Sequence, residues 1–145
     1  MFQNRDERSQ FLIVHPASMD EPSKKKYTLT FTEHPEHLHA IIRCETMDRD
    51  IALAYLREIA DKCSELRSRR LIVERDVPVM LPDSDLFFTT DDFMRMVPRV
   101  RVAFVNPYAQ LQDQMEFAIM IGTNRGAEFS VHNTIDAAEK WLAEA

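Results

Sequence analysis

The segment RLIVERDVPVMLPDSDLFFTTDDFMRMV, residues 70–97, decides the fold of this chain. Its apolar run at residues 71–73 predicts a buried strand, because aliphatic and β-branched side chains suit a pleated sheet. A polar loop over residues 76–85 follows, and a helix comes next. Thr89 and Asp92 have the spacing of a capping box, so we expect this helix to begin near Thr89. A strand that runs through a polar loop into a helix is half of a β-α-β unit, and such loops hold ligands and switches in α/β proteins.

The composition narrows the class of protein. The length of 145 residues fits one domain, and 45% hydrophobic with 29% charged residues is ordinary for a folded chain. The net charge of −6 gives no overall attraction to nucleic acid or anionic lipid. The two glycines, Gly122 and Gly126, are too few for a Gly-rich phosphate loop. The apolar run at residues 11–14 is too short for a signal peptide or a membrane span, and Cys44 and Cys63 lack a C-x-x-C spacing. We therefore expect a cytoplasmic protein with reduced cysteines and no cofactor.

The first part of the chain predicts an arm followed by a hairpin. Residues 1–26 are charged around one apolar patch, and we expect this N-terminal arm to dock as an edge strand or on a partner subunit. The domain itself is expected over residues 27–145. Apolar residues alternate with threonines over residues 27–32, which predicts a half-buried strand, and residues 38–44 predict its hairpin partner.

Helix boundaries are predicted from capping residues. Thr46 or Asp48 is expected to cap a first helix, whose apolar residues recur at helical spacing. Asn106 offers a second cap, and Pro107 after it suits the first position of a helix. Gly122 then suits the C-terminal cap of that helix.

The remaining elements complete an α/β pattern. Residues 100–105 and 127–132 predict two further strands, and Asn133 or Thr134 is expected to cap a final helix. The order is therefore β-β-α-β-α-β-α-β-α. It predicts a mixed, mostly parallel sheet of about five strands flanked by about four helices.

The carboxyl ends of the parallel strands form the default binding edge of such a sheet. There we expect a rim of polar residues that forms either a small pocket or a partner-docking surface. The alternative is structural: the asparagines cap helices and the aspartates are solvated. No nucleophile-base pair stands at motif spacing, so no catalytic residue is predicted. The residues expected at the rim are Glu45, Asp76, Asp83, Ser84, Asp85, Asn106, Tyr108, His132 and Asn133.

Two features of this sequence have a functional and a structural interpretation. A phosphate on Ser84 would add about −2 of charge ahead of a helix, although Asp83 and Asp85 would repel it. A histidine cluster, with neighbouring glutamates, surrounds the hairpin turn and offers ligands for zinc or nickel. Strand alternation separates its members, so a solvated turn is favoured over a metal site. The cluster consists of His34, His37 and His39.

The second half of the chain resembles SpoIIAA-like (STAS/SEC14-type) bacterial proteins. The similar stretches are RVRVAFV at residues 99–105, NRGAEF at residues 124–129 and DAAEKWL at residues 136–142. With the order of elements, the resemblance spans about 120 residues. It implies the mixed sheet described above and no enzyme chemistry. The wider family includes anti-sigma-factor antagonists that are switched by phosphorylation of a serine in the loop before the second helix. Ser84 lies in the corresponding loop, but Asp85 stands where the regulatory members carry Ser-Gly-type residues.

Three hypotheses on function follow. The first is a non-catalytic, self-associating or partner-binding regulatory module, for which residues 86–88, residues 11–14 and several methionines offer apolar surface. The second, from the SEC14 side of the resemblance, is a carrier of a small apolar or lipid ligand, which needs a pocket of at least a few hundred Å³ between residues 86–96 and 111–120. The third and weakest is a metal enzyme built on the histidine cluster.

Overall fold

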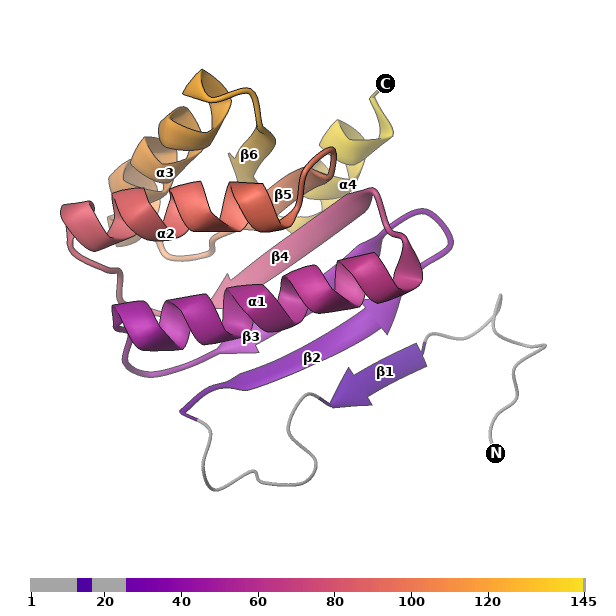
Figure 1. Cartoon of the computed structure of the whole chain (residues 1–145), viewed down its shortest axis with the longest axis horizontal. Helices are drawn as coiled ribbons and strands as arrows, with labels where there is room; N and C mark the ends of the chain where they lie inside the picture. Colours follow the sequence, from indigo (N-terminus) through magenta and orange to yellow (C-terminus); the bar gives the residue numbers. More distant parts are fainter. Residues whose placement is uncertain (1–12, 17–25, 145) are drawn as a thin grey trace.

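The computed structural model describes residues 13–16 and 26–144, and the fold is stated for these residues. One six-stranded sheet runs through them in the order β1-β2-β3-β4-β5-β6 (Figure 1). Strand β2 pairs antiparallel with both β1 and β3, and β3 to β6 are mutually parallel. The α/β class predicted from the sequence is confirmed. The strands are β1 (Ile13–Pro16), β2 (Thr28–Glu33), β3 (Leu38–Arg43), β4 (Arg70–Asp76), β5 (Arg101–Val105) and β6 (Glu128–His132).

Helices cover the two faces of the sheet unequally. Three helices lie side by side on one face, and α4 packs alone on the other, against β4, β5 and β6 (Figure 1). None of the described helices is both long and apolar enough to cross a lipid bilayer. The helices are α1 (Arg49–Leu66), α2 (Asp83–Met96), α3 (Gln112–Asn124) and α4 (Ile135–Ala143), and a short 3₁₀ helix, η3 (Ala109–Leu111), precedes α3.

Strand β4 is the centre of the core. Leu71, Ile72 and Val73 are all fully buried, because α1 to α3 cover one face of β4 and α4 covers the other. Side chains alternate along the strand: Leu71 and Val73 belong to the apolar cluster under α1 to α3, whereas Ile72 packs in the cluster under α4. The same alternation places the next two residues, Arg75 and Asp76, on opposite faces.

Helix α1 begins and ends with recognisable caps. Asp48 is its N-cap, and its carboxylate accepts a hydrogen bond from the Ile51 N–H at 2.8 Å, as one of the two predicted capping residues. At the other end Arg67 takes the left-handed conformation at φ 55°, and the Ser68 N–H returns to the Cys63 carbonyl at 2.9 Å. This is the Schellman arrangement, in which glycine is the usual residue.

Helix α2 starts six residues earlier than the capping-box pattern predicts. It begins at Asp83 after Pro82, so Asp83 and Asp85 lie in its first turn rather than in a loop. Two carboxylates there complement the positive end of the helix dipole, which explains the early start. Thr89, the predicted cap, instead lies in the middle of the helix, where it is buried. Its hydroxyl donates to the carbonyl of Asp85 at 2.8 Å.

The boundaries predicted for the third helix are also wrong. Asn106 does not cap it, because η3 and then α3 begin several residues later. Gly122 lies inside α3, where a Cβ atom would stand 2.6 Å from the Phe129 ring. Gly126 is the residue that ends the helix: its φ is 92°, and the Ala127 N–H bonds back to the Gly122 carbonyl at 2.9 Å.

Two predictions at the ends of the described chain are confirmed. Strand β1 pairs antiparallel with β2, so part of the arm adds an edge strand, as one of the two alternatives predicted. Residues 11 and 12 of the predicted apolar patch lie outside the described residues. Thr134 caps α4 by accepting from the Ala137 N–H at 3.2 Å.

Candidate functional site at the carboxyl edge of the sheet

The parallel strands β3 to β6 bring their carboxyl ends to one edge. Backbone hydrogen bonds continue past the strands there: the Cys44 N–H donates to the Asp76 carbonyl at 3.4 Å, and the Asn106 N–H donates to the His132 carbonyl at 2.9 Å. The ends of adjacent strands are thus held in register. The backbone of three predicted rim residues, Asp76, Asn106 and His132, therefore lies along the same edge.

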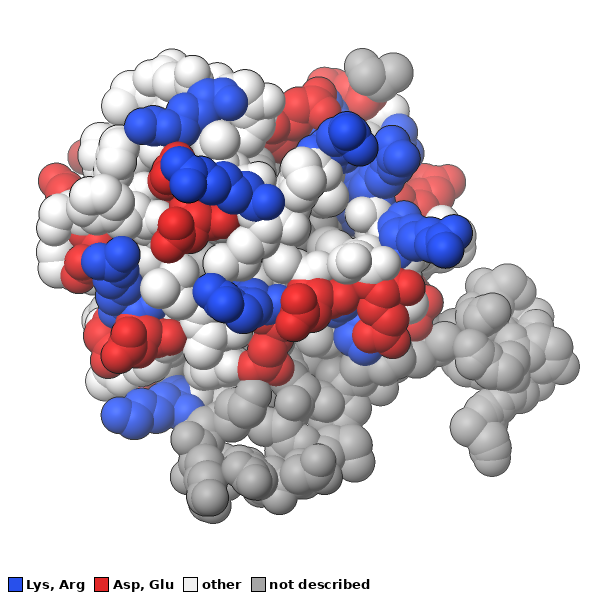
Figure 2. Space-filling model, in the orientation of Figure 1, with Lys and Arg blue, Asp and Glu red and all other residues white. Residues whose placement is uncertain are grey.

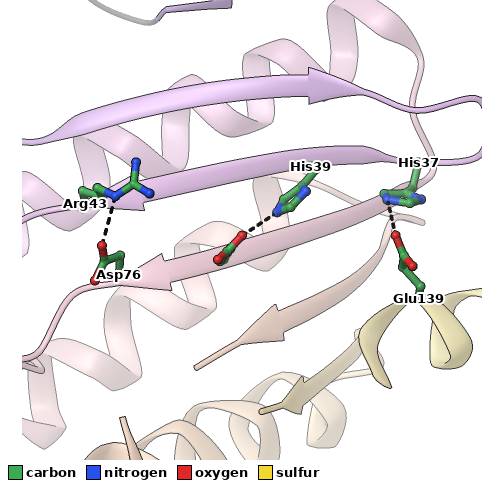
Figure 3. Close-up of polar contacts among 6 residues, drawn as sticks. His37, His39, Arg43, Asp76 and Glu139 are labelled. Carbon is green, nitrogen blue, oxygen red and sulfur yellow. Dashed lines mark hydrogen bonds and ion pairs between the residues drawn. The ribbon is translucent and has the colours of Figure 1, made fainter. Parts of the chain in front are cut away.

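Asp76 is the centre of a polar cluster on this edge. Its carboxylate accepts from the Tyr108 hydroxyl at 2.6 Å and from Nε of Arg43 at 3.0 Å, the ion pair drawn in Figure 3. Both hydrogen bonds lower the pKa of Asp76, and the one from Tyr108 has the larger effect. The Tyr108–Asp76 hydrogen bond also raises the pKa of Tyr108. The side chains of Arg43 and Asp76 are 58% and 45% exposed, so the pair is open to solvent and adds little stability.

The side chain of Asn106 holds the backbone of Tyr108 in place. Its side chain is 1% exposed, accepts from the Tyr108 N–H at 3.1 Å and donates to the Tyr108 carbonyl at 2.9 Å. Both polar atoms of the amide are therefore used on one residue's backbone. This role differs from the helix cap that the sequence suggests: Asn106 closes a turn that holds the Tyr108 hydroxyl near Asp76.

His132 reaches the edge with its backbone only. Its ring lies 2.7 Å from the Ser130 hydroxyl and 5.9 Å, between centroids, from the Trp141 ring of α4. Burial lowers the pKa of His132. Within the described part of the chain, no hydrogen bond joins this ring to the Asp76 cluster, so His132 supports α4 instead.

The first turn of α2 forms a second, separate group. Asp83 and Ser84 are exposed, and Asp85 is half-buried. None of these three side chains has a hydrogen bond or ion pair with another described residue. Of the predicted rim residues, the fold therefore assembles only Asp76, Asn106 and Tyr108 into one cluster. The start of α2 remains open to solvent, His132 packs toward α4, and Glu45 and Asn133 are exposed.

Arg75, which was not predicted as a site residue, is a buried charge close to this edge. It is 4% exposed and points to the side of the sheet that α1 to α3 cover. Its terminal nitrogens donate to the Val79 carbonyl at 3.2 Å and contact Sδ of Met115 at 3.9 Å. The signal was present, because alternation from Leu71 and Val73 predicts that Arg75 faces the same core.

The outer surface of α2 and its neighbours combines aromatic rings with charges. Phe88 is 49% exposed, and the Arg49 guanidinium lies 5.5 Å from its ring. On the other side Arg125 lies 4.9 Å from the Phe87 ring and pairs with Asp91 at 3.2 Å. Figure 2 views this face and shows basic and acidic side chains interspersed across it. Leu86, which the sequence places with the two phenylalanines as exposed, is buried.

The histidine cluster lies at the opposite, amino end of the parallel strands. The His34 and His37 rings are stacked with centroids 4.6 Å apart, so their nitrogens do not converge on one point. His39 pairs with Glu74 at 2.8 Å, and His37 lies 3.9 Å from Glu139 of α4 (Figure 3). Among the described residues, no three His, Cys, Asp or Glu side chains are grouped so that they could hold a metal ion. The geometry therefore does not support a metal centre at this turn.

Comparison with known proteins does not assign the chain to a class. No family model matches the sequence, and no curated protein matches it.

Proposed function

We propose that this chain is a non-catalytic protein-interaction module whose partner binds the outer face of α2. Exposed Phe88, beside the Arg49 guanidinium, is the observation that carries the proposal. The surface proposed here, called the α2 face below, consists of Ser84, Phe88 and Arg49. Aromatic and arginine side chains dominate the energetic centres of protein interfaces. The resemblance of the sequence to STAS-type anti-sigma-factor antagonists also favours such a module.

Ser84 is well placed to regulate the α2 face. It is exposed in the first turn of α2, four residues before Phe88, so the two side chains lie on the same side of the helix. A phosphate on Ser84 would add about −2 of charge next to Asp83 and Asp85. The positive end of the helix dipole would accommodate that charge. The modified α2 face would, however, be strongly acidic, and a partner that fits the unmodified face would no longer match it. Phosphorylation is therefore proposed to weaken partner binding.

The carrier hypothesis receives no comparable support. The apolar cavity between α2 and α3 has a volume of about 60 Å³, well below the few hundred Å³ that a lipid-sized ligand requires. Self-association, as a homodimer, stays a prediction, because the partner of the α2 face is either a different protein or a second copy of this chain. One experiment separates these two outcomes.

Photo-crosslinking from the α2 face tests the proposal. A photoreactive phenylalanine analogue replaces Phe88 in one variant and Met120, which is 50% exposed on α3, in a matched control. Illumination in host cells is expected to give a discrete adduct from position 88 and none from position 120. Ser84→Asp should weaken this adduct several-fold, and Ser84→Ala should retain it. An adduct with a second copy of the chain would identify self-association, and equal labelling from both positions would refute a specific α2 face.

A further inference from the structure

Arg75 occupies an unusual position for a charged side chain. It is the last but one residue of β4, and its side chain enters the layer between the sheet and helices α2 and α3. Only 4% of the residue is exposed. Burying a guanidinium costs free energy unless a carboxylate or a full set of hydrogen bonds compensates it.

The contacts visible around Arg75 occupy two of its three side-chain nitrogens. Its two contacts, with the Val79 carbonyl and the Met115 sulfur, use one N–H of each terminal nitrogen. A guanidinium carries further donors beyond these. In the portion of the chain that the structure describes, no carboxylate lies within 4.0 Å of the Arg75 nitrogens. Asp76, the next residue, faces the other side of the sheet and is paired with Arg43 and Tyr108.

A cavity of about 60 Å³ lies next to this guanidinium. Its walls are almost wholly apolar, with Leu86 and Phe93 from α2, Met115 from α3 and Phe129 from β6. Thr90 also lines it, is 9% exposed, and makes no side-chain hydrogen bond with any described residue. A positive charge from β4 and a free hydroxyl from α2 therefore share one small apolar chamber.

We infer that this cavity binds a small monocarboxylate with a short apolar tail, its carboxylate on Arg75 and Thr90. The inference goes beyond the α2 face and does not depend on it. A planar carboxylate matches the fork of N–H donors on a guanidinium, and a hydroxyl supplies a further donor. The apolar walls suit a hydrocarbon tail. A phosphate fits less well, because one cation in apolar surroundings does not offset its larger charge and hydration.

The size of the cavity sets the size of the ligand. A buried water needs about 10–15 Å³ of such space, so the chamber holds a few non-hydrogen atoms. Acetate and propionate are of this size. Met80 and Ile119, which are half-buried, also line the cavity, so it reaches toward the protein surface.

Titration of the full chain with propionate, followed by two-dimensional NMR at constant ionic strength, tests the site. Saturable shifts of the Thr90 amide and of the Arg75 side-chain N–H are expected, with a dissociation constant of about a millimolar because so few atoms bind. Propionamide, which has the same shape and no charge, should bind at least about tenfold more weakly. This comparison uses the unmodified protein, so it does not depend on whether any variant folds.

Two variants and a matched control sharpen the result. Arg75→Met should lose the response to propionate, whereas Arg43→Met, the same change on the opposite face, should retain it. Ala118→Val narrows the cavity without touching Arg75 and should weaken propionate binding several-fold. Octanoate should bind no better than propionate. Equal binding of propionamide and propionate, or undiminished binding of propionate by folded Arg75→Met, would overturn the carboxylate site. A higher affinity for octanoate than for propionate would overturn the size inferred for the ligand.

Discussion

The two ends of the parallel strands differ in whether their ionisable groups are charged. At the amino end, burial is the largest cause that lowers the pKa of His37, from 6.5 to about 4, and the neighbouring His34 and His39 add to the shift. At the carboxyl end, hydrogen bonds from Tyr108 and Arg43 lower the pKa of Asp76 and keep it ionised. Both shifts are downward, yet one removes a charge and the other preserves one.

The difference follows from solvent and donors. The side chain of His37 is 11% exposed, and its Nε2 has no hydrogen-bond partner among the described residues. The Glu139 carboxylate, at 3.9 Å, is too distant to accept a hydrogen bond from it. Asp76 is open to water and has two donors. The carboxyl end therefore presents a stable charge pattern outside, whereas the amino end contributes packing. This contrast favours the carboxyl end and the adjoining α2 as the interacting part of the molecule.

The largest effect is expected from Asn106→Ala at the carboxyl end. The change removes two hydrogen bonds from a buried amide and leaves the Tyr108 backbone groups to find other partners, at a cost of about 2–3 kcal/mol in the free energy of unfolding. Urea denaturation measures it. Asn133→Ala is the control: Asn133 is exposed and follows the adjacent strand β6 at the same edge, so this change should alter stability by less than about 0.5 kcal/mol. Similar losses in both variants would show that the Asn106 turn is not a fixed support.

The second largest effect is a loss of stability on acidification, caused by His37 at the amino end of the sheet. The unfolded chain binds a proton on His37 near pH 6.5, and the folded chain binds it only near pH 4. Between these values the unfolded state carries the extra proton, so stability falls as the pH drops from 6.5 to 4 and gains nothing further from this group below 4. One pKa unit corresponds to about 1.4 kcal/mol, and partial access of water reduces the sum to about 2 kcal/mol.

The measurement is urea denaturation of the wild type and of His37→Gln at pH 7, 5.5 and 4.5. The variant should have a flatter pH profile, because one of the groups that resist protonation is gone. His34 and His132 shift in the same direction and leave part of the slope in place. A wild-type profile parallel to that of the variant would contradict the shift assigned to His37.

Local sequence signals predicted the fold wherever a strong pattern was present. The buried run Leu71-Ile72-Val73 identified the central strand. At two helix starts the pattern offered a pair of candidate caps, and Asp48 and Thr134 are the members of each pair that cap the helix. Where two signals competed, the wrong one was chosen. The Thr89 and Asp92 spacing resembled a capping box, but Pro82 followed by acidic residues starts the helix a turn and a half earlier.

The candidate site was predictable only in part, because topology and side-chain direction are separate questions. Parallel strands brought the backbone of Asp76, Asn106 and His132 to one edge as expected. Which side chains meet there depends on the alternation within each strand and on the turn that Asn106 closes. The burial of Arg75 follows from that alternation only when it is continued to the end of β4. The cavity between α2 and α3 depends on packing that no local pattern encodes.

A smaller effect, with the opposite sign, is expected at the end of α1. Arg67 holds a left-handed conformation at φ 55°, which costs a residue with a Cβ atom more than it costs glycine. Arg67→Gly should therefore stabilise the fold by about 0.5–1 kcal/mol, measured by urea denaturation. Arg69→Gly is the matched control, since Arg69 is not among the positive-φ residues, and it should destabilise instead. Stabilisation by both changes would mean that removal of charge near the amino end, rather than backbone strain, is responsible.

The smallest effect on stability, and the most direct test of the contrast between the two ends, is Tyr108→Phe. Tyr108 and Asp76 meet in solvent, so loss of their hydrogen bond should leave the urea midpoint unchanged within error. The pKa of Asp76 should nevertheless rise toward its ordinary value, because the Tyr108 hydroxyl is the largest cause of the shift. NMR titration of the Asp76 carboxyl carbon measures this, with Arg43→Met as the companion variant. An unchanged pKa in Tyr108→Phe, with a rise in Arg43→Met, would make Arg43 alone the group that keeps Asp76 charged, and Asn106 would then support a turn without electrostatic consequence.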